Sequence, residues 1–252
     1  MRRLGTPARH LGTVGSTMAE AAAWAADGAP HGALVTAEHQ TAGRGRHGRA
    51  WTDAPGASLM LSLVLRPRLP PGRLALVGLA AGLALAEALD TFGADAEVKW
   101  PNDVRVEGRK LAGVLAEAAW TGPRTAVLVG VGLNVSPASV PPALADRAAA
   151  LSAVAGRPVA RLEPLAPFLD HLARRLDDAE RAPHRLIAAF EGRMEGVGRE
   201  VHVAYPGTDR QALAGRVLGV GPDGALRLAT PEGEVAVRAG EVTLAPSSLP
   251  VP

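Results

Sequence analysis

The spacing of apolar residues changes along the chain and separates strands from helices. Short apolar or alternating runs predict strands at four places in the first 195 residues, namely 33–38, 57–66, 96–120 and 125–135. The run at 96–120 is interrupted by turns at 101–103 and 107–108. A longer apolar run at 74–93 predicts a buried helix of about five turns. A helical pattern in two or three pieces follows from about 143 to 193.

The segment GSTMAEAAAWAADG at 15–28 predicts a capped helix. Ser16 or Thr17 can serve as the N-cap, and Glu20 stands where a capping box places its acidic residue. Gly28 can end the helix, because glycine is favoured just beyond a helix C-terminus. The strand at 33–38 follows this helix directly.

After Gly196 the pattern becomes one of short strands separated by Gly and Pro turns. About five strands in some 50 residues are typical of a small β-barrel. We therefore expect an α/β (α+β) protein with two domains, 1–195 and 196–252.

Composition narrows the class of protein. Hydrophobic residues make up 47% of the 252 residues but aromatic residues only 3%, so the core must consist of Ala, Val and Leu. There is no cysteine, which excludes disulfides, thiolate metal sites and thiol nucleophiles in this chain. No window approaches the ~20 uninterrupted apolar residues that cross a bilayer. The N-terminus lacks the apolar stretch of a signal peptide, so we expect a cytoplasmic protein that does not bind a membrane.

Charge is concentrated at one place although the net charge is only +2. Residues 43–49 read GRGRHGR and are called the arginine loop below. Arginine forms two parallel hydrogen bonds to a phosphate or carboxylate, and glycine lets the backbone close over a ligand. The loop is consistent with a lid over a phosphate or adenylate. A nucleic-acid-binding arm and a solvated loop remain alternatives.

Lysine and asparagine are rare in this sequence. The only lysines are Lys99 and Lys110, and the only asparagines are Asn102 and Asn134. A chain that uses Arg wherever charge suffices marks its remaining lysines as candidates for specific chemistry. The alternative is chance in a small sample.

The segment KWPNDV at 99–104 places an amide and a carboxylate on one turn. Asn102 can read the edge of a base, and Asp103 can hold Mg²⁺. The alternative interpretation of this segment is an ordinary Asx turn. For Lys110 the alternative is a solvated charge at the edge of a sheet, and for Asn134 it is a simple transition from strand to loop. His39 and His47 lack a metal-ligand spacing.

Taken together, these segments resemble the biotin–protein ligase family. Its motifs occur in order as GST at 15–17, Gln40, GRGRHGRAW at 43–51, KWPNDV at 99–104, KLAGVLAE at 110–117 and GVGLNV at 130–135. The resemblance covers about residues 10–245. It implies a class II synthetase-like catalytic domain with a mixed sheet, followed by an SH3-like barrel. It also implies ATP-dependent formation of biotinyl-5′-AMP and transfer of biotin to a lysine of a biotin carboxyl carrier protein domain, with Mg²⁺.

The resemblance also implies roles for individual residues. Arg44, Arg46 and Lys110 are expected to be catalytic, and Asp103 to lie on the metal side. The expected biotin contacts are Ser16, Thr17, Met18, Gln40, Arg44, Gly45, Arg46 and Lys110. The expected nucleotide contacts are Arg46, Arg49, Trp51, Asn102 and Asn134. Met18 departs from the family, which usually has Asn there, so only a backbone contact is expected from that position.

Further implications concern partners. The chain begins about ten residues before the first ligase motif, so we expect a ligase without a DNA-binding domain, either monomeric or a ligand-dependent homodimer. Two rival functions are a lipoate ligase with the same fold and an RG-type nucleic-acid-binding protein. The scarcity of aromatic residues argues against the second rival.

Overall fold

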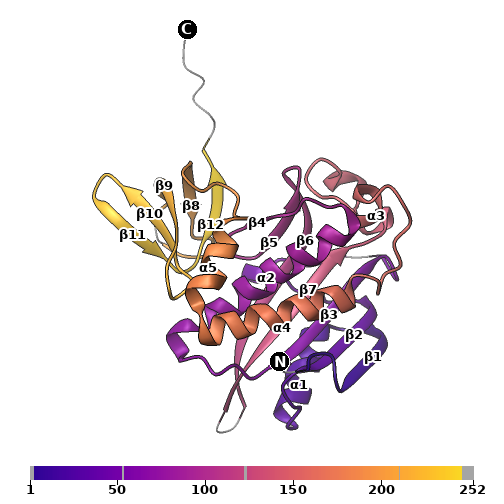
Figure 1. The fold of residues 1–252 in the computed structure, drawn as a ribbon. Coiled ribbons are helices and arrows are strands. Elements are labelled where there is room, and N and C mark those ends of the chain that lie inside the picture. Colours follow the sequence, from indigo (N-terminus) through magenta and orange to yellow (C-terminus); the bar gives the residue numbers. More distant parts are fainter. Residues whose placement is uncertain (1–2, 53, 122–123, 210, 246–252) are drawn as a thin grey trace.

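The computed structural model describes residues 3–52, 54–121, 124–209 and 211–245 (Figure 1). The helices are α1 (Thr17–Ala26), α2 (Ala75–Leu89), α3 (Leu151–Val154), α4 (Leu165–Arg181) and α5 (Pro183–Glu191). The strands up to residue 134 are β1 (Ala8–Val14), β2 (Ala33–Gln40), β3 (Ser58–Leu65), β4 (Glu97–Lys99), β5 (Asp103–Val106), β6 (Arg109–Thr121) and β7 (Arg124–Asn134). The later strands are β8 (Glu200–Ala204), β9 (Leu213–Val220), β10 (Leu226–Thr230), β11 (Gly233–Val237) and β12 (Glu241–Leu244).

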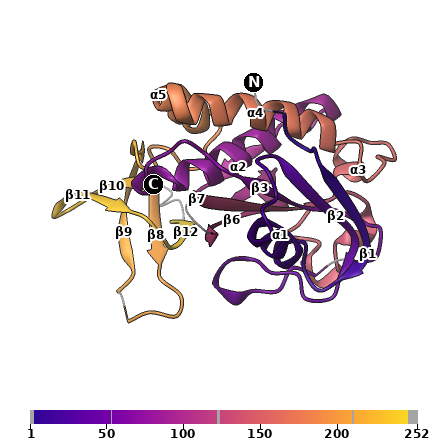
Figure 2. The ribbon, with the colours of Figure 1, turned by 90° about the horizontal axis from the view of Figure 1, so that it is seen from below.

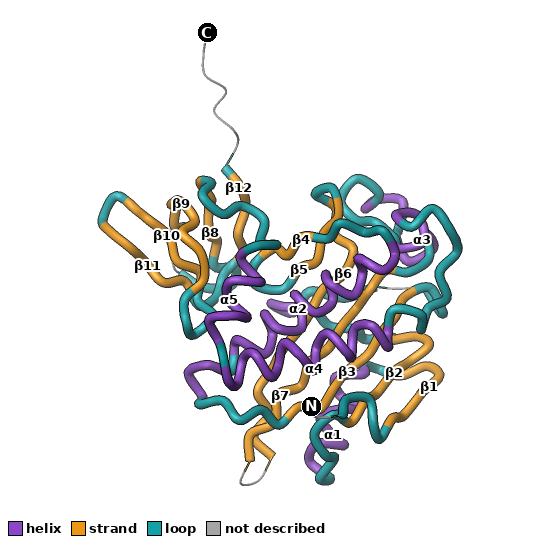
Figure 3. Tube along the Cα trace, in the orientation of Figure 1, coloured by secondary structure: helices purple, strands orange, loops and turns teal. Residues whose placement is uncertain are grey.

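Strands β1 to β7 form one mixed sheet in the order β1-β2-β3-β7-β6-β5-β4 (Figure 3). β1 runs parallel to β2, and the other neighbours are antiparallel. The central strand β3 is buried along its whole length, as its continuous apolar run predicts. The short hairpins on either side of β5 bring the KWPND segment and Lys110 close together on the β4–β5–β6 side of this sheet.

The helices cover both faces of the sheet (Figure 2). α1 packs on one face through Met18, Ala21 and Ala25. α2 lies on the other face and is itself covered by α4. A helix enclosed in this way is apolar on almost every side, which explains the predominantly apolar run at 74–93.

The stretch Pro71–Phe92 also has the length and composition of a membrane span, with a hydropathy of 1.6. However, 67% of that window is buried inside the protein. Its apolar character is therefore accounted for by the core, since the sheet and α4 already cover it.

Strands β8 to β12 form a separate antiparallel sheet in the order β11-β10-β9-β8-β12. This confirms the five short strands expected after Gly196. The turn between β11 and β12 approaches the open end of the first sheet, and the turn between β9 and β10 reaches the beginning of α2. Both turns take part in the arrangement of the site.

Two local expectations differ from the structure. Ser16 occupies the N-cap position of α1 in an extended conformation but makes no side-chain cap hydrogen bond, so the predicted capping box is absent. The Thr17 hydroxyl instead bonds to Gln40, because tertiary contacts compete with the cap. The edge strand β1 was not predicted, since its mostly exposed residues carry no buried apolar face.

Candidate active site

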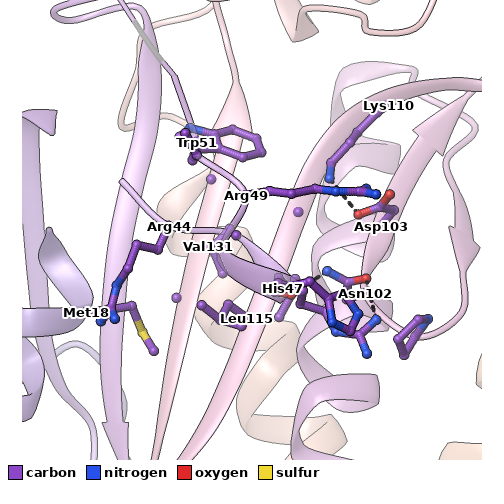
Figure 4. A pocket seen from close by; sticks show the side chains of 18 of the residues that line it. Met18, Arg44, His47, Arg49, Trp51, Asn102, Asp103, Lys110, Leu115 and Val131 are labelled. Atoms are coloured by element: carbon purple, nitrogen blue, oxygen red, sulfur yellow. Dashed lines mark hydrogen bonds and ion pairs between the residues drawn. The ribbon is translucent and has the colours of Figure 1, made fainter. Parts of the chain in front are cut away.

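A cavity of about 240 Å³ opens where the two sheets meet (Figure 4). Every residue predicted for the site except Asn134 lines it. These are Ser16, Thr17, Met18, Gln40, Arg44, Gly45, Arg46, Arg49, Trp51, Asn102, Asp103 and Lys110. Residues as far apart in the sequence as Ser16 and Thr243 thus line the same cavity, because the strand order brings their segments together.

The arginine loop folds back on itself beside this cavity. The Gly45 N–H donates to the Arg49 carbonyl at 2.7 Å, and the Trp51 N–H donates to the Gly43 carbonyl at 2.9 Å. A side chain on Gly43 would place its Cβ 2.6 Å from the Trp51 carbonyl oxygen, so only glycine allows this close return. The lid role expected for this loop stays a prediction.

The Trp51 ring packs against two glycines, Gly113 of β6 and Gly132 of β7. A Cβ on Gly132 would come within 2.5 Å of the Trp51 ring, and one on Gly113 within 3.4 Å. The glycines of GVGLN and KLAG therefore leave the space that the indole fills. The indole N–H is buried and has no hydrogen-bond partner among the described residues.

One end of the cavity is a buried network of neutral groups. Gln40 Oε1 accepts hydrogen bonds from the Thr17 N–H at 2.7 Å and from the Thr17 hydroxyl at 3.0 Å. The buried Ser62 hydroxyl donates to Thr17 Oγ1 at 2.8 Å. Met18 is 4% exposed and packs against Gly130. This end is fixed by short hydrogen bonds and tight packing.

The other end carries charge. Lys110 Nζ lies 2.7 Å from Asp103 Oδ1 and 5.7 Å from the centre of the Trp51 ring. After the β5–β6 turn at Glu107–Gly108, Lys110 pairs with Arg105 in the sheet, and its side chain reaches Asp103 two residues further along β5. Figure 4 shows this pair apart from Arg44, which lies near Met18.

Arg46 and Arg49 connect the arginine loop to neighbouring segments. Arg46 Nη1 makes long contacts of 3.5 Å to Asn102 Oδ1 and 3.4 Å to the Gly240 carbonyl. Burial lowers the pKa of Arg46, and the nearby Asp103 and Glu241 carboxylates oppose this shift; the guanidinium stays charged. Arg49 Nη2 pairs with Glu241 Oε1 at 2.6 Å.

Lys99 also lines the cavity, although no role was predicted for it beyond its rarity. Burial lowers the pKa of the Lys99 ammonium below its usual value, and the neighbouring Arg105 guanidinium lowers it further. Both lysines of the chain therefore face the same cavity. This supports the inference from their scarcity.

Sequence reasoning missed the contribution of the C-terminal sheet. Gly240, Glu241, Val242 and Thr243 line the cavity, and nothing in their sequence marks them as site residues. Ser62 was also missed, although a lone serine in the apolar stretch LMLSLVL could have indicated it.

Two polar residues named in the sequence lie apart from the lining. Asn134 is 6% exposed, and its Nδ2 donates to the Ala149 carbonyl at 3.2 Å. His39 is also outside the lining, whereas His47 belongs to it. Among the described residues no group of three His, Cys, Asp or Glu side chains could hold a metal ion by itself.

Comparisons with known proteins identify the family of the chain. Residues 14–134 match the model of the Biotin/lipoate A/B protein ligase family. The chain is 37% identical over 236 residues to a biotin–[acetyl-CoA-carboxylase] ligase of Mycobacterium tuberculosis, covering 90% of this chain and 85% of that protein. The chain belongs to the biotin–protein ligase family.

Other members of the biotin–protein ligase family support the same assignment. A biotin–[acetyl-CoA-carboxylase] ligase of Paracoccus denitrificans is 36% identical over 242 residues, covering 92% of this chain and 98% of that protein. The biotin protein ligase of Aquifex aeolicus, solved in complex with biotin and ATP, superposes with a TM-score of 0.81 at 30% identity. That alignment covers 96% of this chain and 100% of the other, so the likeness includes both sheets.

Proposed function

We propose that the chain is an ATP-dependent biotin–protein ligase. It joins the carboxylate of biotin to AMP with release of pyrophosphate, and it then transfers the biotinyl group to a lysine of a biotin carboxyl carrier protein domain. The observation that carries the proposal is the single cavity in which the arginine loop, the KWPND turn and Lys110 meet in a member of this family. A cytoplasmic location accompanies this function.

The neutral end of the cavity is suited to biotin. Thr17 and Gln40 offer fixed polar groups, and Ser16 and Gly45 line the same region. Met18 supplies an apolar wall where the family usually has Asn, so we assign it packing and a backbone contact only. A rigid pocket of this kind binds a neutral bicyclic ring without much loss of side-chain entropy.

The charged end is suited to the nucleotide. Arg46 and Arg49 can contact phosphate oxygens, and the Trp51 ring lines the same cavity. Asn102 places its Oδ1 towards the cavity. Asn134 does not line the cavity, and its amide donates to the Ala149 carbonyl. We therefore propose that Asn134 supports the nucleotide site indirectly, by holding the end of β7 in place.

Between the two ends the reacting groups must meet although both are negative. A carboxylate oxygen of biotin attacks the α-phosphorus of ATP, the bond to the β,γ-diphosphate breaks, and pyrophosphate leaves. Arg44, Arg46 and Lys110 lower the repulsion and stabilise the charge that grows in the transition state. In the second step a neutral lysine amine of the carrier attacks the acyl carbon, an amide forms and AMP leaves.

The residues present fit a Mg²⁺ ion bound together with ATP. Mg²⁺ commonly uses one or two protein carboxylates and takes its remaining ligands from phosphates and water. Asp103 and Glu241 both line the charged end of the cavity. Asp103 would hold the ion from the protein side, and the ion would neutralise phosphate charge when bound.

The proposal also includes the domain boundary and the oligomeric state. We place the domain boundary between residues 195 and 196, where the connection leads into the C-terminal sheet. The exposed edge strand β1 leaves the sheet open to pairing, which is compatible with a monomer or with a ligand-dependent homodimer. No DNA partner is proposed.

Pyrophosphate release tests this function directly. Purified protein is incubated with MgATP and either biotin or lipoate, and pyrophosphate is measured with and without each acid. We expect release that depends on biotin, followed by a mass increase of one biotinyl group on an added carrier domain. Equal release with lipoate, or none with biotin, would refute the assignment.

A further inference from the structure

The KWPND turn is attached to the C-terminal sheet through Trp100. This side chain is 4% exposed, and its indole N–H donates to the Gly224 carbonyl at 3.1 Å. Both groups are buried, and they lie 124 positions apart in the chain. A buried donor and acceptor that satisfy each other define the relative position of the segments that carry them.

The position of Gly224 is itself constrained by backbone conformation and packing. It lies in the turn between β9 and β10, where its φ of +85° favours glycine. A Cβ there would lie 3.3 Å from Ala75 Cβ and 3.4 Å from Leu79 Cδ1, so the turn sits closely against the start of α2. The Gly221 N–H also donates to the Ala225 carbonyl at 2.8 Å. The position of the Gly224 carbonyl, which accepts the Trp100 hydrogen bond, is therefore fixed by packing against α2 and by the hydrogen bond across the turn.

The remainder of the β4–β5 hairpin is attached to the segment that precedes the C-terminal sheet. The Val98 N–H donates to the Arg193 carbonyl at 2.8 Å, and the Glu195 N–H donates to the Val98 carbonyl at 2.9 Å. Arg105 Nη1 lies 3.0 Å from both carboxylate oxygens of Glu195. These bonds hold the strands, while Trp100 holds the turn between them.

The KWPND turn also positions groups at the charged end of the cavity. Asn102 Nδ2 donates to the Val114 carbonyl at 3.0 Å, and the Val114 N–H donates to the Asn102 carbonyl at 2.8 Å. Asn102 Oδ1 meets Arg46, and Asp103 meets Lys110. A shift of the turn would move these groups together, whereas Thr17 and Gln40 lie on other elements.

We infer that Trp100 is a positioning residue for nucleotide binding: its bond to the Gly224 carbonyl lets the C-terminal sheet set the place of Asn102 and Asp103. The inference rests on the proposed function, because that function assigns the charged end to ATP. It gives the C-terminal sheet a specific contribution to the first half-reaction, separate from any contact with the carrier domain.

Two substitutions at position 100 separate the hydrogen bond from packing. Trp100→Phe removes the donor and part of the ring, whereas site-specific replacement by β-(3-benzothienyl)alanine keeps the shape of the indole and removes only the N–H. Trp24→Phe is the matched control, since Trp24 lies on α1 and stacks with Arg9 outside the cavity. The affinity for a non-hydrolysable ATP analogue and the KM values for ATP and biotin are measured for each variant.

Both position-100 variants should weaken ATP binding about fivefold or more, because one buried acceptor loses its partner. The KM for biotin and the values for Trp24→Phe should stay unchanged. Unchanged ATP affinity in the benzothienyl variant would overturn the inference, as would an equal change in the KM values for biotin and ATP. If the parent protein does not activate biotin, the proposed function fails, while the affinities for the ATP analogue still decide the role of Trp100.

Discussion

The two ends of the cavity are built in different ways. At the neutral end, Thr17, Gln40 and Ser62 form a buried network with bonds of 2.7–3.0 Å, all within the first sheet and α1. At the charged end, Arg46 makes contacts of 3.4–3.5 Å, and the exposed Arg49 pairs with Glu241 of the C-terminal sheet. The first end is held by hydrogen bonds between its own groups. The second has charged groups that a polyanion can draw together.

This difference suggests a division of labour. Pre-assembled hydrogen bonds select a neutral ring by shape and polarity, whereas long arginine contacts can be exchanged for stronger ones to phosphate. Substitutions at the charged end should therefore change ATP binding and the chemical step. Substitutions at the neutral end should change biotin binding alone.

The largest expected effect is at Lys110. Lys110→Ala should lower the rate of biotinyl-5′-AMP formation about 10²- to 10³-fold, as expected on removing one preorganised electrostatic group. Lys110→Arg should recover only part of that rate, because a planar fork does not reproduce a compact ammonium. Biotin-dependent exchange of pyrophosphate into ATP measures the rate. A loss confined to carrier binding would contradict the assignment.

Arg46→Gly should release the adenylate. Loss of a charge-assisted contact should speed its escape about tenfold or more, so that lysines of a bystander protein become biotinylated. Most of the label should appear on the bystander protein, because the ligase has only two lysines, Lys99 and Lys110. Mass spectrometry of both proteins measures this.

The exposed Arg238, which pairs with Asp223, provides the matched control for Arg46. Arg238→Gly should behave like the parent protein. Retention of the adenylate by Arg46→Gly would show that the arginine loop does not hold it.

Ser62→Ala addresses the neutral end. Removal of the hydroxyl that supports Thr17 should raise the KM for biotin about fivefold, the effect of losing one buried hydrogen bond. The KM for ATP should not change. Steady-state kinetics with each substrate varied in turn provides the comparison, and a larger effect on ATP would reverse the assignment of the two ends.

Arg49→Ala should have a smaller effect. Since Arg49 is exposed, its ionic contacts are screened, and the KM for ATP should rise only about two- to fivefold. The rise should shrink at high salt because screening already weakens the contact in the parent protein. Initial rates at two ionic strengths test this, and an effect that does not depend on salt would argue against a charge interaction.

The smallest effect on binding is expected at Glu87, far from both ends. Burial raises its pKa, but hydrogen bonds from Arg175 and His171 outweigh burial and hold the pKa below its usual value. The stabilisation is therefore present above the pKa of the unfolded chain and is lost as pH falls through the folded pKa. Glu87→Gln should lower Tm by about 2–5 °C at neutral pH.

That loss in Tm should shrink as the pH falls through the lowered folded-state pKa of Glu87, because the parent carboxylate is then protonated in both states. Neither KM value should change in Glu87→Gln. Thermal melts across this pH range, together with neutral-pH kinetics, measure both outcomes. A constant difference in Tm at all pH values would exclude the charge of Glu87 as the cause.

The sequence predicted most of the central strands and α2, because their apolar runs are long and continuous. It also predicted that the arginine loop, the KWPND turn and Lys110 belong together, although the evidence was family resemblance and residue scarcity more than spacing. It did not predict β1, whose exposed residues leave no pattern. The predicted capping box does not form, because the Thr17 hydroxyl donates to Gln40 Oε1 instead. Such a tertiary contact is not visible in the local sequence.

The contribution of Gly240–Thr243 could not be predicted for a related reason. These residues read as an ordinary turn and short strand, and only the docking of the second sheet places them at the cavity. The bond between Trp100 and Gly224 depends on the same docking. Contacts between distant segments are set by packing, which a local pattern does not encode.

Native mass spectrometry gives the most direct test of the central claim that one cavity holds both substrates while they are joined. The protein is incubated with biotin and MgATP, and its complexes are weighed without denaturation. We predict one biotinyl-5′-AMP bound per chain, formed only when both substrates are present. Detection of bound ATP and biotin that never combine, or of no bound adenylate at all, would contradict the account.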